Sequence, residues 1–96
     1  MEVNKRLNYR EFKEELFANK EQFSFVGETY NLTTKDIVEV IATEYKLFIE
    51  YDSDKSIFNF LEYLTDLLIE SIVVDIEESD ALMVASIVLN IYSAAC

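Results

Sequence analysis

The chain has 96 residues, of which 51% are hydrophobic, and its 19 acidic against 8 basic residues give a formal net charge of −11. This hydrophobic content excludes intrinsic disorder. The charge opposes direct binding to DNA, RNA or an anionic membrane, because phosphate contacts require clustered cations. We expect one domain, residues 1–96. A single glycine and no proline favour helices joined by short polar loops over a sheet of tight hairpins.

The first predicted helix runs from about residue 8 to residue 20, with Asn8 as its candidate N-cap. Its apolar residues recur at helical spacing: Tyr9, Phe12, Leu16 and Phe17. The next segment, residues 21–32, breaks this period. We expect it to be an irregular connector or a short strand, whose aromatic residues fold back onto the core: Phe23, Phe25 and Tyr30.

The second predicted helix, residues 33–51, has the clearest start signal. Thr33 and Asp36 form a capping box, with Asp in place of the usual Glu. The residues that then follow helical spacing are Ile37, Val40, Ile41, Glu44, Tyr45, Phe48 and Tyr51.

A third helix is predicted from about residue 56 to residue 76, and a fourth over residues 80–95, capped by Ser79 or Asp80. The fourth segment carries no charge after Asp80. Since a helix that is apolar all round is a buried one, we expect it at the centre of the packing or against a second subunit. Its side chains expected to be nearly inaccessible are Leu82, Ile87 and Ile91. The four segments together predict an all-α fold, a small antiparallel four-helix bundle.

The chain lacks several features that catalysis commonly uses. It has no histidine, and one glycine cannot form a phosphate-binding loop. The segment that begins at Asp52 starts like a calcium loop but has Ile57 and Tyr63 where that loop needs Gly and Glu. Acidic pairs such as Glu11 and Glu14 resemble the magnesium ligands of all-α nucleotide pyrophosphatases, although such pairs arise by chance on any acidic helix. We therefore predict no enzyme, no metal site and no cofactor.

The distribution of acidic residues is more informative. Glu62, Asp66 and Glu70 are four apart, which stacks them on one helix face, and like charges at this spacing repel. Residues 50–80 hold ten acidic residues and only Lys55 as a base. Tyrosines among carboxylates are typical of protein-recognition surfaces. The candidate partner-binding residues are Tyr51, Asp52, Asp54, Glu62, Tyr63, Asp66 and Glu70.

These features predict a small acidic protein that inhibits a basic protein. The favoured form is an immunity protein, an antitoxin that neutralises a cognate nuclease toxin, because nucleases have cationic substrate clefts. The four-helix colicin DNase immunity proteins are analogous in size, charge and class, but their Tyr-Tyr-Pro signature is absent and no family match is claimed. The alternatives are a phage-encoded nucleic-acid mimic that inhibits a host defence protein, and a helical structural or regulatory subunit that forms a homodimer through its apolar C-terminal helix.

The expected location is the cytoplasm. The first residues contain no apolar signal-peptide core. The longest uncharged run, Ala81 to Cys96, is 16 residues and lacks cationic flanks, whereas a membrane-spanning helix needs about 20 apolar residues. We therefore expect a soluble protein, with no membrane partner. The single cysteine, Cys96, allows no internal disulfide.

Overall fold

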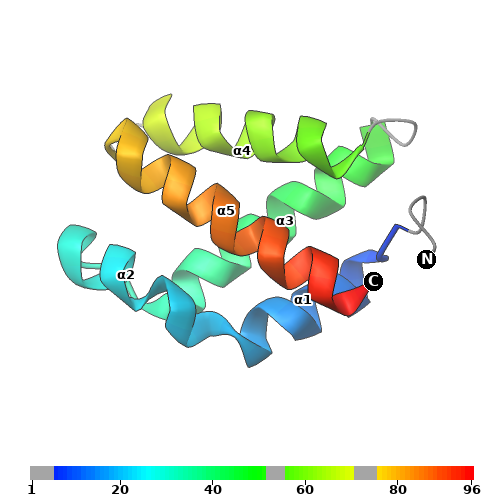
Figure 1. Ribbon diagram of the computed structural model, residues 1–96, viewed down its shortest axis with the longest axis horizontal. Helices are drawn as coiled ribbons and strands as arrows, with labels where there is room; N and C mark the ends of the chain where they lie inside the picture. Colours follow the sequence, from blue (N-terminus) through cyan, green and yellow to red (C-terminus); the bar gives the residue numbers. More distant parts are fainter. Residues whose placement is uncertain (1–5, 52–55, 71–75) are drawn as a thin grey trace.

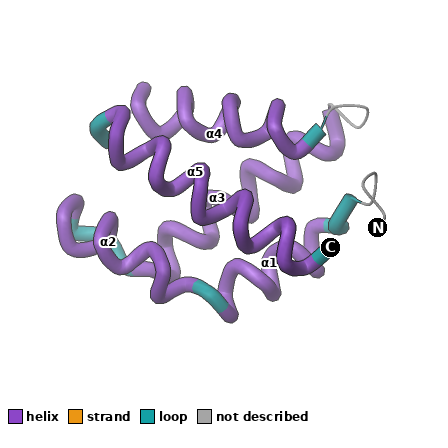
Figure 2. Tube along the Cα trace, viewed as in Figure 1, coloured by secondary structure: helices purple, strands orange, loops and turns teal. Residues whose placement is uncertain are grey.

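The computed structural model describes residues 6–51, 56–70 and 76–96, and these ranges are helical without any strand (Figures 1 and 2). The elements in chain order are α1 (Tyr9–Ala18), the short 3-10 helix η1 (Lys20–Phe23), α2 (Ser24–Tyr30), α3 (Thr34–Tyr51), α4 (Ile57–Glu70) and α5 (Glu78–Ala95). The all-α prediction is confirmed. The predicted antiparallel bundle of four helices is not, because the described residues form five α-helices. Residues 71–75, which we placed in the third helix, lie outside the described ranges.

Helices α3 and α5 each pack against several of the other elements. Figure 1 shows α4 along one side of the molecule and α1 and α2 along the opposite side, with α3 and α5 crossing between them. Helix α5 packs against α4 and α1, and α3 packs against α1 and α4. Helices α3 and α4 lie close together where α3 ends and α4 begins, and they diverge from that point (Figure 1).

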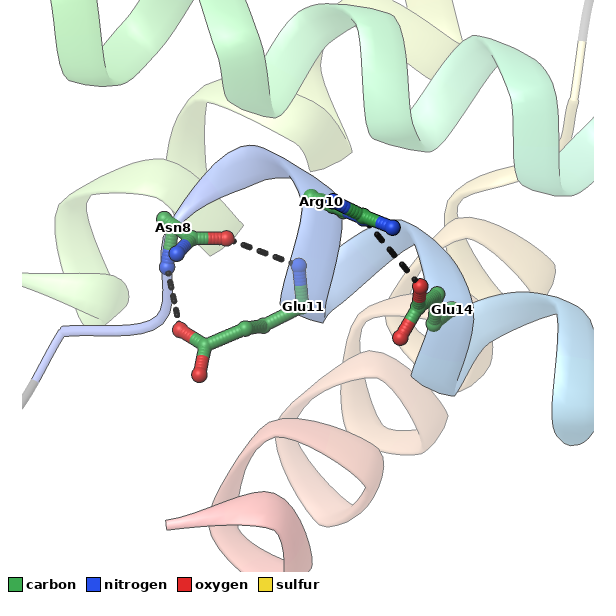
Figure 3. A network of polar contacts seen from close by, with 4 residues as sticks. All are labelled: Asn8, Arg10, Glu11 and Glu14. Atoms are coloured by element: carbon green, nitrogen blue, oxygen red, sulfur yellow. Dashed lines mark hydrogen bonds and ion pairs between the residues drawn. The ribbon is translucent and has the colours of Figure 1, made fainter.

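Local hydrogen bonds explain where the first helix begins. The Oδ1 of Asn8 accepts from the backbone N–H of Glu11 at 2.8 Å, and Glu11 Oε1 accepts from the N–H of Asn8 at 3.1 Å (Figure 3). This reciprocal capping box confirms Asn8 as the N-cap. Arg10 and Glu14 form an ion pair one turn further on, at 3.5 Å (Figure 3). The two glutamates considered as magnesium ligands thus make local contacts that stabilise α1.

The N-cap predicted for the second helix, Thr33, is also confirmed. The N-cap predicted for the last helix is wrong. The Oγ1 of Thr33 accepts from the backbone N–H of Asp36 at 3.0 Å. Helix α5 begins at Glu78 after an N-cap at Glu77, so Ser79 and Asp80 lie inside its first turn instead of capping it. Asp80 makes a different contact, because its Oδ2 accepts from the hydroxyl of Tyr30 at 2.7 Å.

The connector prediction is wrong in its secondary structure and right in its packing. Residues 20–30 are helical, as η1 and α2, instead of irregular or strand. Phe23 is fully buried, and Phe25 and Tyr30 pack against the core as partly buried side chains. The buried residues Phe23, Val26 and Gly27 are spaced by three and four, which is the helical period that the sequence interpretation overlooked.

Aromatic rings from four helices form the centre of the core. The Tyr45 ring of α3 lies 4.3 Å from Phe12 of α1, 5.3 Å from Phe60 of α4 and 6.2 Å from Tyr92 of α5, centroid to centroid. The Tyr45 hydroxyl donates to the backbone oxygen of Leu7 at 2.5 Å, and the N–H of Leu7 donates to the hydroxyl of Tyr92 at 3.2 Å. Burial of its hydroxyl raises the pKa of Tyr45 well above its ordinary value. These contacts attach the segment before α1 to the middle of the molecule.

Within the single chain, helix α5 buries one side only, so the expectation that it lies at the centre of the packing is wrong there. Burial against a second subunit stays a prediction. Ile91 is 3% exposed, as expected, and Ile87 is partly buried. Leu82, however, is 51% exposed, and the neighbouring Met83 is 50% exposed. Uncharged does not mean apolar: the exposed side of α5 also carries polar residues without charge, among them Ser86, Asn90 and Ser93.

Candidate protein-binding surface on α3 and α4

One face of α4 is a row of exposed carboxylates. Glu62, Asp66 and Glu70 are all exposed, while the opposite side of the helix buries Phe60 and Leu64 in the core. None of the three carboxylates forms an ion pair with a lysine or arginine of the described residues. Successive members lie one helical turn apart, about 6 Å along the axis. Each is therefore available to a separate cation of a partner. We call these three residues the carboxylate row.

Tyr63 connects the carboxylate row to α3. Its hydroxyl donates a hydrogen bond of 2.6 Å to Oε1 of Glu44, and 44% of the residue is exposed. The hydrogen bond to the Glu44 carboxylate raises the pKa of Tyr63, because ionisation would remove the donated proton and place two negative charges together. The ring is thereby held between the two helices, with part of its apolar surface open to a partner.

Helix α3 contributes an apolar stripe beside Glu44. Val40, Leu47 and Tyr51 follow one another at spacings of seven and four residues, with Glu44 between the first two, so all lie along one side of the helix. Val40 is 48% exposed, Leu47 41% and Tyr51 80%. The sequence analysis grouped Val40, Glu44 and Tyr51 by helical spacing with Ile41 and Tyr45, which the structure buries. The spacing is that of a helix, but these three positions lie at the rim of its buried face.

Two lysines, Lys13 of α1 and Lys46 of α3, lie against aromatic rings of α1. The Nζ atoms of Lys13 and Lys46 lie 5.6 and 5.3 Å from the centre of the Tyr9 ring, and Lys13 also lies 5.9 Å from the Phe17 ring. These cation–π contacts place both ammonium groups at the junction of α1 with α3. They are therefore unavailable to neutralise the carboxylate row on α4.

Five of the seven candidate binding residues lie in the described ranges, and Asp52 and Asp54 lie outside them. The structure gathers Tyr63 with the carboxylate row and joins it to α3 through Glu44. Tyr51, at the C-terminal end of α3, shares the stripe that contains Glu44. Sequence reasoning missed Val40, Glu44 and Leu47 as surface residues, although the i, i+4, i+7 spacing of these residues is a signal that could have found them.

The described helices give no sign of a membrane span: none of those within residues 6–51, 56–70 and 76–96 is both long and apolar enough to cross a bilayer. Comparisons of the chain with protein-family models, with curated proteins and with solved structures found no match.

Proposed function

We propose that this chain is an acidic binding protein that inhibits a basic protein, and that it acts as an immunity protein against a nuclease toxin. The observation that supports this most directly is the carboxylate row, exposed and without a cation of the described residues beside it. Three like charges on consecutive turns destabilise a free helix. A basic partner offsets that cost and gains faster association through electrostatic steering.

The proposed mechanism is occupation of a cationic cleft. A nuclease binds the phosphates of its substrate with lysines and arginines, and the carboxylate row offers negative groups at regular intervals to the same side chains. Tyr63, fixed by its bond to Glu44, and the more exposed Tyr51 act as apolar anchors within this charged surface. Inhibition then follows from exclusion of the nucleic acid and requires no catalytic group of the inhibitor.

Affinity capture with matched charge variants tests the binding surface. The bait is the intact chain, compared with the triple variant Glu62→Gln, Asp66→Asn, Glu70→Gln. A control variant removes three carboxylates elsewhere: Glu14→Gln, Glu21→Gln, Glu28→Gln. Both variants change the net charge of −11 by the same three units. We expect the wild type and the control to capture the same basic protein from the native organism and the carboxylate-row variant to lose it. Equal capture by all three baits would contradict the proposal.

Inhibition is tested on the captured protein. Its nuclease activity should fall when the purified chain is added in equimolar amount and should persist with the carboxylate-row variant. A captured protein without nuclease activity would contradict the immunity role while leaving the binding surface intact. Gene order separates the immunity protein from a phage-encoded nucleic-acid mimic, since a neighbouring toxin gene indicates the former and a phage operon the latter.

A second candidate function is that of a dimeric structural or regulatory subunit. The observation in its favour is the pair of exposed apolar residues on α5, Leu82 at 51% and Met83 at 50% exposure. Sedimentation at low concentration distinguishes the two functions. A dimer that Leu82→Gln with Met83→Gln converts to a monomer would support the subunit, and a wild-type monomer would contradict it.

A further inference from the structure

An apolar groove opens where α3 diverges from α4. The groove has a volume of about 260 Å³. The described residues that line it belong to α2, α3, α4, α5 and the segments next to these helices. Ile41 and Val84, each 1% exposed, and the partly buried Leu68 are among the residues that line it, together with the half-exposed Val40 and with Asp36.

A second, shallower hollow adjoins this groove on the outer side of α3. It has a volume of about 410 Å³ and is lined by Asp36, Glu39, Val40, Thr43 and Glu44. Asp36 and Val40 therefore line both hollows. The apolar groove therefore lies beside a surface that carries three acidic residues, Asp36, Glu39 and Glu44. Glu44 also accepts a hydrogen bond from the hydroxyl of Tyr63.

The size of the groove indicates what it can hold. An engineered apolar cavity of roughly 150 Å³ binds benzene, while pockets for drug-sized ligands and cofactors occupy roughly 300–1,000 Å³. The groove, at about 260 Å³, lies between these values. It fits one or two apolar side chains better than a cofactor. The adjoining carboxylates favour a cationic segment, because Asp36 and Glu39 are exposed and attract cations, whereas they would repel an acidic segment.

We propose that the groove receives the apolar face of a basic amphipathic helix of the protein partner. One apolar side chain enters the groove beside Val40, and lysines or arginines one turn away on that helix meet Asp36, Glu39 and Glu44. A helix is the fitting element because the described residues offer no strand edge for an extended peptide, whereas a hydrophobic groove between helices is a common receptor for an amphipathic helix. This inference rests on the proposed function and adds the kind of segment that the partner presents.

The test uses a synthetic helical peptide of about 15 residues, near the shortest length that holds a helix in water. It carries leucines at i, i+4 and i+7, a few lysines or arginines one turn from them, and alanines elsewhere, and a second peptide of identical charge has alanine in place of the leucines. The protein is the intact chain with labelled methyl groups, titrated with each peptide at fixed salt. We expect the leucine peptide to shift the methyl resonances of Val40, Ile41, Leu68 and Val84. The alanine peptide should leave those resonances in place.

Matched variants locate the contact. Val40→Gln keeps the charge and places a polar amide at the groove, and it should weaken peptide binding at least tenfold. Met83→Gln makes the same kind of change on α5, at a residue of similar exposure outside the groove lining, and should leave binding unchanged. Equal weakening by both variants, or no binding by the leucine peptide, would overturn the groove assignment. So would a wild-type dimer that Val40→Gln dissociates, because a second copy would then fill the groove.

These outcomes are separate from those of the proposed function. The carboxylate-row variant tests α4, whereas Val40→Gln tests the groove. If the carboxylate-row variant loses the captured partner but Val40→Gln binds partner and peptide as the wild type does, the groove inference fails and the proposed function stands. If Val40→Gln loses the leucine peptide while capture is insensitive to the carboxylate row, the proposed surface on α4 fails and the groove remains a binding site.

Discussion

Gly27 lies where the neighbouring backbone leaves no room for a side chain. Its carbonyl accepts from the N–H of Leu32 at 2.8 Å, in a turn closed by Asn31 with φ of 57°. A Cβ atom added at Gly27 would lie 2.6 Å from the backbone oxygen of Leu32. The absence of a side chain is therefore what lets the end of α2 turn back this closely.

Gly27→Ala should accordingly destabilise the protein, by about 1–3 kcal/mol, since backbone atoms must move to admit the methyl group. The usual effect of alanine in a helix is the opposite, a gain of roughly 0.5–1 kcal/mol. The sign of the change in unfolding free energy, measured by chemical denaturation, decides between the two. Glu28→Ala, at the next and exposed position, serves as a control and should be near neutral.

Tyr45 should make the stability of the fold depend on alkaline pH. Burial raises the pKa of its hydroxyl above the ordinary value of 10.0, so the folded state holds the proton more tightly than the unfolded chain. The stabilisation is complete below pH 10 and declines as pH rises beyond it, by up to about 1.4 kcal/mol per pH unit for this group. Tyr30 and Tyr63, whose pKa values are raised by hydrogen bonds to Asp80 and Glu44, add to the same decline.

Tyr45→Phe tests this dependence. The variant should lose about 1–2 kcal/mol near neutral pH, because the Leu7 carbonyl loses its donor, and its unfolding free energy should fall less steeply above pH 10 than that of the wild type. Urea denaturation in steps from neutral pH to about pH 11 measures both effects. Parallel curves for the two proteins would show that Tyr45 does not titrate on unfolding.

Among the elements, α5 offers a direct comparison of a buried and an exposed position. Ile91→Ala should cost about 2–5 kcal/mol through the cavity it leaves in the core. Leu82→Ala should cost less than about 1 kcal/mol, because half of the side chain already lies in solvent. Thermal and chemical denaturation of the two variants measures the difference. Equal costs would mean that Leu82 is covered in solution, as in a dimer formed through α5.

Helix α4 should tolerate the loss of its carboxylates. Glu62→Gln, Asp66→Asn and Glu70→Gln each remove repulsion between exposed groups, so the unfolding free energy should stay unchanged or rise by roughly 0.2–0.5 kcal/mol per pair. The helical circular dichroism signal should be retained. If Asp66→Asn and Glu70→Gln instead destabilise the fold while partner capture is unaffected, the carboxylates serve the structure and the binding surface lies elsewhere.

At the scale of the whole molecule, the carboxylate row on α4 and the two lysines held by aromatic rings lie on different elements. The cation–π contacts hold Lys13 and Lys46 at the junction of α1 with α3, while the carboxylate row lies exposed on α4. The net charge of −11 attracts a basic partner over a distance, and we expect the carboxylate row to add to that attraction.

The exposed carboxylate row predicts that the association rate with the captured partner depends on salt concentration. The rate should fall as ionic strength rises from about 0.01 to 0.15 M, because the screening length shrinks from about 30 to 8 Å. The carboxylate-row variant should associate more slowly with a flatter salt dependence, and its dissociation rate should change less. Truncation of Tyr63 should mainly raise the dissociation rate. Stopped-flow or surface-binding kinetics at several salt concentrations measure all of these, and a salt-independent association rate would contradict steering.

The sequence by itself determined the helical class, the caps at Asn8 and Thr33, and the spacing of the carboxylate row. These features depend on contacts within a few residues, and helical geometry fixes them once the period is recognised. Only the tertiary structure decided that Val40 and Leu82 are exposed and that α2 is a helix, with Gly27 giving the chain room to turn back after it. It also decided that Tyr63 pairs with Glu44 and that an apolar groove lies beside Asp36.

A helical period defines which residues share a face, but the width of the buried sector depends on how closely the neighbouring helices approach. Here α3 and α4 diverge (Figure 1), and Val40, at the edge of the apolar face of α3, is 48% exposed.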